Sequence, residues 1–524
     1  MQRFAELLDR LVYTTARNAK LKLLEDYFRS TPDPDRGWAL VALTDGLPLR
    51  LPIRKTLATI LEPHVDPLLY RLSRDYVGDT AETVSLLWPD RSENSSSLGI
   101  SEVVAEVSAA SNREFPRVLE RLLDRLDAKG RFALLKLLSG ALRVGVSARL
   151  AKTGIAQAFG STVEEIEEVW HAVSPPYLDM FAWLDGVGER PDPGRKATFR
   201  PVMLAHPIEE GDWRSFAPED VAAEWKWDGI RVQLSARPGD VRLFSRAGDD
   251  ISGAFPDIVQ AFAHTEGVLD GELLVLRAGV VASFNDLQQR LNRKTVTGKM
   301  LQDYPAHIRL YDILFDRAED VRGLTYIERR ARLEAWYERF TPSLADVSAL
   351  VPFAAFGELE EKWQAARENG IEGLMLKRKD SPYLAGRPKG HWYKWKRAAL
   401  TIDCVLMYAQ RGSGKRSSYY SDYTFGVWKT PDELVPVGKA YSGFTDEELL
   451  RLDRWIRTNT VERFGPVRQV AQALVLEIAF DAVQPSSRHK SGVALRFPRV
   501  HRIRWDKPAS EAETLDAVRA LLPV

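Results

Sequence analysis

The stretch AAEWKWDGIRVQL, residues 222–234, places a lysine just before an alternating apolar run, with an aspartate and a glycine close behind it. A lysine in a strand can be an ordinary charge that faces solvent. Its amine, when neutral, is also a nucleophile that can form a covalent intermediate. Because Lys-x-Asp-Gly arises often by chance, Lys226, Asp228 and Gly229 leave both interpretations open, and the rest of the chain has to decide between them.

Groups suited to binding a nucleotide triphosphate follow in order along the chain. Carboxylates stand within strand-like segments at Glu272 and Glu372, and an aromatic residue, Tyr311, lies beside Asp312. Arginine binds phosphate through a rigid fork of donors and lysine as a compact charge. The other members of the series are Arg231, Arg246, Lys377, Lys394, Lys396, Arg504, Asp506 and Lys507. A strand would put Lys394 and Lys396, two residues apart, on one face.

The N-terminal region, which precedes the segments that hold these residues, is helical. Residues 1–190 show helical spacing of apolar positions, as in FPRVLERLLDRLDAKG, which we expect to end with a C-cap at Lys129-Gly130. STVEEIEEVWHAV begins with Ser161 followed by Glu164, a capping-box pattern. The segment 184–201 is rich in glycine, proline and charge, which indicates a linker.

From about residue 200 strand patterns appear. GIRVQLSA and DVRLFSRAG alternate with period two around the turn at residues 237–240, Arg-Pro-Gly-Asp, which predicts a hairpin. Strands in GVLDGELLVL, HIRLYDILFD and IEGLMLKRK, mixed with helices in YIERRARLEAWYERF and LEEKWQAAREN, predict an α+β domain. A small barrel is predicted by the short strands that follow, in TIDCVLMYA, YTFGVWKT, LVPVGKAYSG, ALVLEIAF and LRFPRVHRIRW.

Length and composition agree with a multidomain protein. The 524 residues are too many for a single core, and 45% hydrophobic with 28% charged residues is ordinary for globular proteins. The single cysteine, Cys404, excludes an internal disulfide framework and a cysteine-cluster zinc site, and fits a reducing cytoplasm. No apolar run is long enough for a membrane span, and the charged N-terminus predicts an amphipathic helix, not a secretion signal.

The formal net charge of zero hides two basic windows. Residues 387–397, RPKGHWYKWKR, carry five Lys/Arg and no acid, and residues 488–507 carry seven against one acid. Basic residues interleaved with aromatic ones suit a surface that binds nucleic-acid phosphates. The windows therefore predict a nucleic-acid partner in spite of the neutral total.

The order and spacing of the motifs over residues 224–507 resemble the covalent nucleotidyltransferases, and specifically the ATP-dependent DNA ligases of archaeal and eukaryotic architecture, here from a bacterium or an archaeon. ALRVGVSARLAKTGIAQAFG is similar to a segment of their DNA-binding domain, so the resemblance covers nearly the whole chain. It implies an all-α DNA-binding domain at 1–190, an α+β nucleotidyltransferase (adenylation) domain at 197–398 and an OB-fold β-barrel at 399–524.

The resemblance also implies roles for the site residues. Lys226 is expected to attack the α-phosphorus of ATP and carry AMP as a lysyl-adenylate, in a catalytic set with Asp228. Glu272 and Glu372 are expected to bind Mg²⁺ or Mn²⁺, and one of them to hold the ribose hydroxyls. The other expected contacts are Glu224 at the adenine amine, Tyr311 stacked on the base, Arg231 and Arg246 at ribose and phosphates, Lys377, Lys394 and Lys396 at the α-phosphate, and Arg504, Asp506 and Lys507 at the pyrophosphate.

The implied function is the sealing of 3′-hydroxyl/5′-phosphate nicks in double-stranded DNA by a monomer whose domains enclose the duplex. An mRNA-capping guanylyltransferase and an RNA ligase share the lysine motif and are alternatives, which the helical N-terminal region disfavours. A non-catalytic DNA-binding scaffold is a further alternative. NAD use is disfavoured, because NAD-dependent ligases carry a four-cysteine zinc site. The sequence shows no protein-docking motif and leaves the choice between repair and replication open.

Structural roles compete with some of these assignments. Tyr311 can be core, Asp228 can serve turn geometry, and Arg504 and Lys507 can bind DNA phosphate. Gly229 is expected to allow a close approach of backbone.

Asp312 is expected to be structural, not catalytic. RGSGKRSS, residues 411–418, is similar to a P-loop, but Ala409 and Arg416 replace the required glycine and Ser/Thr, so we expect a barrel loop. The eight histidines show no metal-ligand spacing, which argues against a histidine metal site.

Overall fold

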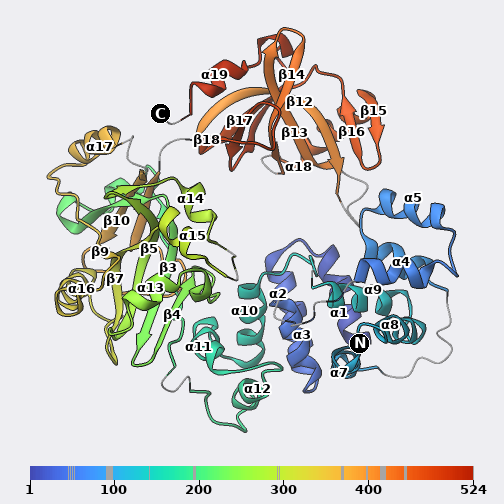
Figure 1. Ribbon diagram of the computed structural model, residues 1–524, viewed down its shortest axis with the longest axis horizontal. Helices are drawn as coiled ribbons and strands as arrows, with labels where there is room; N and C mark the ends of the chain where they lie inside the picture. Colours follow the sequence, from blue (N-terminus) through green and yellow to red (C-terminus); the bar gives the residue numbers. More distant parts are fainter. Residues whose placement is uncertain are drawn as a thin grey trace. The chain divides into compact units, whose positions relative to one another are not determined.

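The computed structural model describes residues 1–44, 47, 49, 51, 53–89, 98–140, 142–192, 196–291, 293, 295–366, 371–396, 399–412, 420–441 and 445–522 (Figure 1). Its backbone contacts define two compact units, one of Met1–Ala158 with Ala398–Val524 and one of Phe159–Arg397. The domain limits at 1–190, 197–398 and 399–524 stay predictions. The P-loop-like stretch falls mostly at 413–419, outside the described residues.

Helices form the N-terminal region, as the apolar spacing predicts. They bury side chains such as Leu8, Phe28, Leu119 and Leu134 completely. Within the described part of the chain, no helix has the length and apolar character that crossing a bilayer requires. The helices are α1 (Gln2–Tyr13), α2 (Arg17–Ser30), α3 (Asp35–Leu43), α4 (Ile53–Leu61), α5 (Pro67–Val77), α6 (Thr80–Leu87), α7 (Ile100–Ala109), α8 (Phe115–Asp124), α9 (Ala128–Ser139) and α10 (Ala148–Phe159).

The predicted helix end at Lys129-Gly130 is wrong. Helix α8 ends at Asp124, and both residues lie in the first turn of α9, where Oδ1 of Asp127 accepts a hydrogen bond from the Gly130 amide at 2.7 Å. An aspartate at this position is a strong N-cap, so it starts a new helix where the glycine suggested an end. The glycine that ends α9 is Gly140, which has φ of 68°.

The predicted capping box of α11 (Val163–Val169) is wrong by one residue. Thr162 is the N-cap and Glu165 its partner: the Glu165 amide donates to Oγ1 of Thr162, and Oε2 of Glu165 accepts from the Thr162 amide at 2.9 Å. Ser161 instead donates to Glu165 at 2.6 Å. Two hydroxyl residues in succession made either one a candidate cap, and the sequence pattern alone did not separate them.

Two sheets make up the predicted α+β region. The first has the order β1-β11-β10-β2, and the second has the order β4-β3-β5-β7-β8, with β6 on β5 and β9 on β7. The strands are β1 (His206–Pro207), β2 (Val221–Trp227), β3 (Ile230–Arg237), β4 (Asp240–Ser245), β5 (Gly267–Arg277), β6 (Val280–Val281), β7 (Ala306–Asp316), β8 (Glu319–Asp320), β9 (Ala345–Val347), β10 (Ile371–Arg378) and β11 (Trp392–Lys396). The helices of this region are α13 (Pro256–Ala261), α14 (Phe284–Gln288), α15 (Gly298–Asp303), α16 (Tyr326–Phe340) and α17 (Phe356–Ala365), and the compact unit Phe159–Arg397 also includes α11 and α12 (Leu178–Leu184).

The predicted hairpin is confirmed. Arg237 pairs with Asp240, so Pro238 and Gly239 form a two-residue loop between β3 and β4. Gly239 has φ of 79°, and proline followed by such a glycine is the pattern of a type II turn.

Each sheet packs one face against helices and leaves the other face toward its partner sheet. The outer face of the first sheet packs with α17 through Leu374, Leu376 and Trp363. The outer face of the second sheet packs with α13 and α16 through Ile258, Leu310 and Trp336. A smaller cluster joins the inner faces, with Met203, Val268, Leu314, Phe315, Tyr383 and Trp392.

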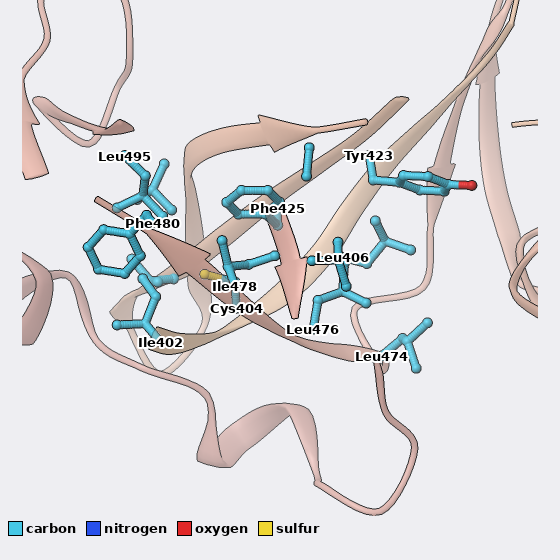
Figure 2. Close-up of a cluster of buried hydrophobic side chains, with 14 of the residues drawn as sticks. Ile402, Cys404, Leu406, Tyr423, Phe425, Leu474, Leu476, Ile478, Phe480 and Leu495 are labelled. Atoms are coloured by element: carbon cyan, nitrogen blue, oxygen red, sulfur yellow. The ribbon is translucent and has the colours of Figure 1, made fainter. Parts of the chain in front are cut away.

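The C-terminal strands curl around one apolar core, as the barrel prediction requires. Figure 2 shows Leu406, Phe425 and Leu476 packed inside it beside Cys404, whose thiol is buried. The strands of the OB-type barrel are β12 (Leu400–Arg411), β13 (Tyr420–Thr430), β14 (Glu433–Ala440), β15 (Thr460–Phe464), β16 (Val467–Val470), β17 (Val475–Phe480), β18 (Ala482–Pro485), β19 (Val493–Arg496) and β20 (Arg499–Arg504).

The strand expected at 495–505 is two strands. Phe497, with φ of 51°, and Pro498 separate β19 from β20, because neither conformation continues a ladder. Helix α18 (Asp446–Thr458) was not predicted, although Thr445 and Glu448 form a capping box at its start. The final helix is α19 (Leu515–Arg519).

Candidate active site

A cavity of about 400 Å³ is lined by residues of both sheets of the α+β unit. Nucleotide-sized ligands occupy pockets of roughly 300–1,000 Å³. Asp228 lies in the turn between β2 and β3 and is not part of the cavity wall. The wall brings together these residues expected from the sequence: Glu224, Lys226, Arg231, Arg246, Glu272, Tyr311, Lys377, Lys394 and Lys396.

Three neighbouring strands of the first sheet present a grid of side chains to this cavity. Directly opposite residues of paired strands share a face, and so do residues two apart along one strand. The rows of the grid, written from β2 through β10 to β11, are Lys226-Gly373-Lys396, Glu224-Met375-Lys394 and Ala222-Lys377-Trp392. The intervening residues, such as Trp225, Leu374 and Trp395, point to the opposite face and pack in the core. Alternation alone therefore gathers most of the basic side chains at one surface.

A β-bulge brings Glu372 against Lys226, although Glu372 itself is not part of the cavity wall. The pairing of β10 with β2 shifts between Ile371 and Gly373, so Glu372 is the extra residue. Bulges are common beside active sites because they redirect a side chain. Oε2 of Glu372 accepts from Nζ of Lys226 and lies 3.2 Å from Nζ of Lys396. Gly373 allows the backbone of β11 to approach closely, since a Cβ there would lie 2.2 Å from the Trp395 carbonyl oxygen.

The Glu372 carboxylate bridges two lysines, and its ionisation reflects this. Burial opposes the charged form, but the ammonium groups of Lys226 and Lys396 outweigh burial and hold the pKa of Glu372 well below its ordinary value. Lys226 therefore rests in the structure as one partner of a carboxylate-linked lysine pair.

The second sheet contributes an aromatic residue through a bulge of its own. Asp270 pairs with Asp312 and Gly271 with Leu310, which leaves Tyr311 as the extra residue of β7. The bulge turns Tyr311 to the cavity. Asp312 is buried and binds Arg329 through two bonds of 2.8 and 3.0 Å, as expected of a structural residue.

Glu272 lies on the cavity side of β5, opposite Arg231 on β3. Desolvation is the main reason that the pKa of Glu272 is raised, to about 7, with the charges of Lys226 and Arg231 acting against it. Gly229 brings the Lys226 strand close to it: a Cβ on Gly229 would lie 2.5 Å from the Leu273 carbonyl oxygen and 2.8 Å from Cγ of Glu272. The close approach predicted for Gly229 is confirmed.

Arg231 lines the cavity, but its fork is already engaged. Nη1 donates to the Met203 carbonyl oxygen at 2.6 Å, and Nη2 donates to Asp270 at 2.6 Å and to the Tyr383 hydroxyl at 3.2 Å. Nε of Arg231 is buried without a hydrogen-bond partner. These bonds use three of the five N–H groups of Arg231, and its guanidinium also lies 5.8 Å from the Tyr311 ring centroid. Its predicted contact with ribose and phosphates stays a prediction.

The basic residues crowd one end of the cavity. Arg246 is exposed at the end of β4, and Arg387, which the motif analysis missed, joins it in the wall. Burial, then repulsion from Arg387, Lys396 and Lys226, lowers the pKa of Lys394. Like charges held together in this way are stabilised by a bound anion. Arg387 stands in the basic window at 387–397, which was the available signal.

Glu224 and Lys377 are found together at the inner end of the wall. Nζ of Lys377 lies 2.7 Å from Oε1 of Glu224 and 3.2 Å from the Tyr311 carbonyl oxygen. The Tyr326 hydroxyl of α16, also missed by the motif analysis, donates to the same Oε1 at 2.6 Å. The predicted α-phosphate role of Lys377 is untested, but its ammonium is held beside the predicted base site.

Arg504 and Lys507 lie in the barrel, within the other compact unit. Nζ of Lys507 donates to Oδ2 of Asp403 at 2.8 Å, and Nη1 of Arg504 lies 3.4 Å from the same oxygen. Arg504 also forms a two-bond pair with Asp506, at 3.2 and 3.0 Å. Asp403, on β12, was not among the predicted residues.

A divalent cation fits the chemistry of the site. No group of three or more His, Cys, Asp or Glu side chains suited to a metal occurs among the described residues. Mg²⁺ is usually held by one or two carboxylates together with substrate phosphates and water, and does not need a larger protein cage. Glu272 and Glu372 are such a pair, because they lie close enough for the charge of Glu372 to raise the pKa of Glu272.

A lysine on a strand, facing a nucleotide-sized cavity with two carboxylates and clustered cations, defines a covalent nucleotidyltransferase. Comparison with known families agrees. The family described as ATP dependent DNA ligase domain matches residues 202–396, and ATP dependent DNA ligase C terminal region matches residues 416–507. The chain belongs to the ATP-dependent DNA ligase family. Membership implies use of ATP and a divalent metal, and DNA as the substrate.

Individual relatives extend over most of the chain. A probable DNA ligase of Koribacter versatilis is 35% identical, covering 79% of this chain and 75% of the relative. DNA ligase 1 of Korarchaeum cryptofilum is 29% identical, covering 99% and 98%. The solved structure named Pmar-Lig_Pre has a TM-score of 0.61 and 17% identity, and covers 96% of this chain and 99% of its own, which shows a common fold.

Proposed function

We propose that this ligase seals 3′-hydroxyl/5′-phosphate nicks in duplex DNA through an AMP group carried on Lys226. The observation that carries the proposal is the placement of Lys226: it faces the cavity with Lys394 and Lys396 on the same sheet face and Glu372 bonded to it. A lysine in these surroundings faces a cavity that can hold the electrophile, and the neighbouring cations can stabilise the charge of the phosphates.

In the first step the neutral amine of Lys226 attacks the α-phosphorus of ATP. A nitrogen–phosphorus bond forms, the bond to the pyrophosphate oxygen breaks, and the amine releases a proton. The cations at one end of the cavity, Lys394, Lys396 and Arg246, stabilise the charge on the phosphates. Glu272 and Glu372 would hold Mg²⁺ or Mn²⁺, which supplies further positive charge at the phosphates.

In the second and third steps the adenylate moves to DNA and leaves it. The 5′-phosphate oxygen of the nick attacks the lysyl-adenylate, which forms an anhydride and frees Lys226. The 3′-hydroxyl oxygen then attacks that 5′-phosphorus, a phosphodiester forms, and AMP departs. The energy of the ATP anhydride is thereby carried into the new bond.

The barrel and the helical region are assigned to the DNA and to the leaving group. Arg504 and Lys507, with Asp506 beside them, are proposed to orient pyrophosphate, and the basic windows at 387–397 and 488–507 to bind the DNA backbone. A monomer that encloses the duplex and works in the cytoplasm completes the proposal.

The first experiment follows the label of α-³²P-ATP onto the denatured protein. The wild type, incubated with the nucleotide and Mg²⁺, should retain label that nicked duplex DNA then removes. Lys226→Ala should retain none, whereas Lys362→Ala, a surface lysine on α17 paired with Glu358, should label normally. Label on Lys226→Ala would refute the assignment of the nucleophile.

Parallel arms separate the alternatives. Label from α-³²P-GTP in place of ATP would favour a capping guanylyltransferase, and chase by nicked RNA but not nicked DNA would favour an RNA ligase. Absence of label from ATP, GTP and NAD, in protein freed of AMP beforehand by pyrophosphate, would leave a non-catalytic DNA-binding protein.

A further inference from the structure

The Glu224 carboxylate is a polar group that β2 presents to the cavity beside Lys226. Glu224 pairs with Met375 on one side and forms an isolated bridge with Leu350 on the other. Its strand is therefore paired along both edges at this point. Because its side chain lies on the cavity face of the grid, one row from Lys226, the carboxylate is the group that a nucleotide meets.

One oxygen of this carboxylate is fixed by two donors from different elements. Oη of Tyr326 lies 2.6 Å from Oε1, and Nζ of Lys377 lies 2.7 Å from the same atom. Tyr326 is 0% exposed and Glu224 is 2% exposed, so these bonds form away from water, where they are strongest. Both donors act on Oε1, and Oε2 keeps its acceptor capacity for a ligand.

Lys377 cannot leave this position readily. Its ammonium lies 4.6 Å from the ring centroids of Tyr311 and Trp392 and 5.0 Å from that of Tyr326. Burial lowers the pKa of Lys377, and the charge of Glu224 acts against that effect. An ammonium enclosed by three aromatic faces and a carboxylate is a fixed charge. The Lys377 ammonium therefore stays at the edge of the cavity beside Tyr311, the residue proposed to stack on the base.

We propose that Tyr326 is a positioning residue which, together with Lys377, orients Glu224 so that Oε2 selects adenine over guanine. Adenine has an amine at position 6 that donates to a carboxylate oxygen. Guanine has a carbonyl at that position, and two acceptors facing each other leave both without a donor. The inference rests on the proposed function, since it names the base that the same site accepts.

The fixed orientation of Glu224 also predicts how its replacement by glutamine changes the base preference. In Glu224→Gln the amide oxygen has to occupy the Oε1 position, because Tyr326 and Lys377 both donate there. The amide nitrogen then takes the Oε2 position and presents a donor to the cavity. That donor matches the carbonyl of guanine and meets the amine of adenine, so base preference should move toward GTP.

The test measures lysyl-nucleotide formation with ATP and with GTP and compares the two kcat/KM values. Tyr326→Phe keeps the ring but removes the hydroxyl, and loss of one hydrogen bond to a charged group should lower the ATP:GTP ratio roughly tenfold. Glu224→Gln should lower the ratio further, and Tyr326→Phe in that background should restore part of it, since the amide is then freer to turn.

Controls separate positioning from a general structural effect. Tyr337→Phe removes a hydroxyl from the same helix, one bonded to the Ala345 carbonyl oxygen at 2.8 Å, and should leave the ratio unchanged. A structural defect would lower both nucleotides together. If Tyr326→Phe does not fold, Glu224→Gln alone decides the matter. A ratio within twofold of the wild type in folded Tyr326→Phe or Glu224→Gln overturns the inference.

Failure of the proposed function would look different. In that case the wild type would form no lysyl-AMP, or Lys226→Ala would still form it, whatever the base preference. A wild type that labels through Lys226, with a ratio that neither Tyr326→Phe nor Glu224→Gln changes, would keep the function and remove the base-reading role of Glu224 and Tyr326.

Discussion

Lys507 donates a hydrogen bond to one carboxylate oxygen of Asp403, and Arg504 lies close to the same oxygen. Nζ of Lys507 lies 2.8 Å from Oδ2 of Asp403 and Nη1 of Arg504 lies 3.4 Å from it, while Oδ1 of Asp403 is buried without a hydrogen-bond partner. The two cations proposed to orient pyrophosphate are thus held by a carboxylate on a different strand of the barrel.

Asp403→Asn should slow the first step selectively. The isosteric amide removes the charge that holds Lys507 and Arg504, and loss of a hydrogen bond to a charged group corresponds to roughly a tenfold change. We expect lysyl-AMP formation to fall about tenfold, with joining of a pre-adenylated nick within twofold of wild type. Asp481→Asn, an aspartate of the same barrel that lies 3.5 Å from Arg499, is the control. Equal slowing of both steps would contradict the positioning role.

Gly229→Ala should damage both stability and activity. The new Cβ would meet the Leu273 carbonyl oxygen at 2.5 Å and Cγ of Glu272 at 2.8 Å, so the turn after Lys226 has to move away from β5. Strain of this kind costs roughly 1–3 kcal/mol. Chemical denaturation and the rate of lysyl-AMP formation measure the two effects. Gly211→Ala, at a site with no atom within 4 Å of the added Cβ, should change neither. Wild-type behaviour of Gly229→Ala would show that the approach is not required.

Glu272 should make stability depend on pH in metal-free buffer. Its pKa of about 7 exceeds its ordinary value of 4.5, so the native state holds a proton that the unfolded state has lost. The stabilisation from this proton is complete below pH 4.5 and is lost as the pH rises to 7. Glu272→Gln, which mimics the neutral acid, should remove this slope.

The size of the expected stability difference follows from the raised pKa of Glu272. At pH 8 Glu272→Gln should be the more stable protein, by on the order of 3 kcal/mol, since one pKa unit corresponds to about 1.4 kcal/mol. At pH 5 the two proteins should be close. Urea denaturation at both pH values measures the difference, and Glu338→Gln, an exposed residue of α16, should show no such trend. A variant that is less stable at pH 8 would refute the raised pKa.

DNA binding should weaken steeply with salt. Cations that contact phosphates release counterions, so a plot of log affinity against log salt concentration should be linear with a negative slope. Lys490→Ala, in the exposed part of the window 488–507, should reduce the slope by about one. Lys429→Ala, a barrel lysine paired with Glu433, should leave it unchanged. A flat salt response of the wild type would exclude the backbone-binding role of the basic windows.

Residues on regular strands could be predicted well from sequence alone. Period two places Lys394 and Lys396 on one face, and the structure confirms this pair in the cavity wall. The helical, α+β and barrel order also follows from local patterns. Helix α18 was missed because the expectation of a barrel outweighed its own capping signal.

The two bulges could not be predicted, because they depend on which strands pair and in what register. Glu372 and Tyr311 were identified by motif, but nothing local says that each is the extra residue of a bulge, which brings Glu372 to Lys226 and Tyr311 to the cavity. The surroundings of Lys377 were missed for the same reason: Tyr326 lies on a helix 102 residues after Glu224, the residue that it contacts. Long-range contacts of this kind appear only once the chain is folded.

The grid formed by β2, β10 and β11 depends on the register of these strands. Each strand contributes alternate residues to the chemistry and the remaining ones to an aromatic core, so a shift by one residue exchanges the two sets completely. A single-residue deletion within β11 would bury Lys394 and Lys396 and expose Tyr393 and Trp395. Substitutions can therefore vary this site one residue at a time, whereas insertions or deletions inside these strands would remove its whole basic surface in one event.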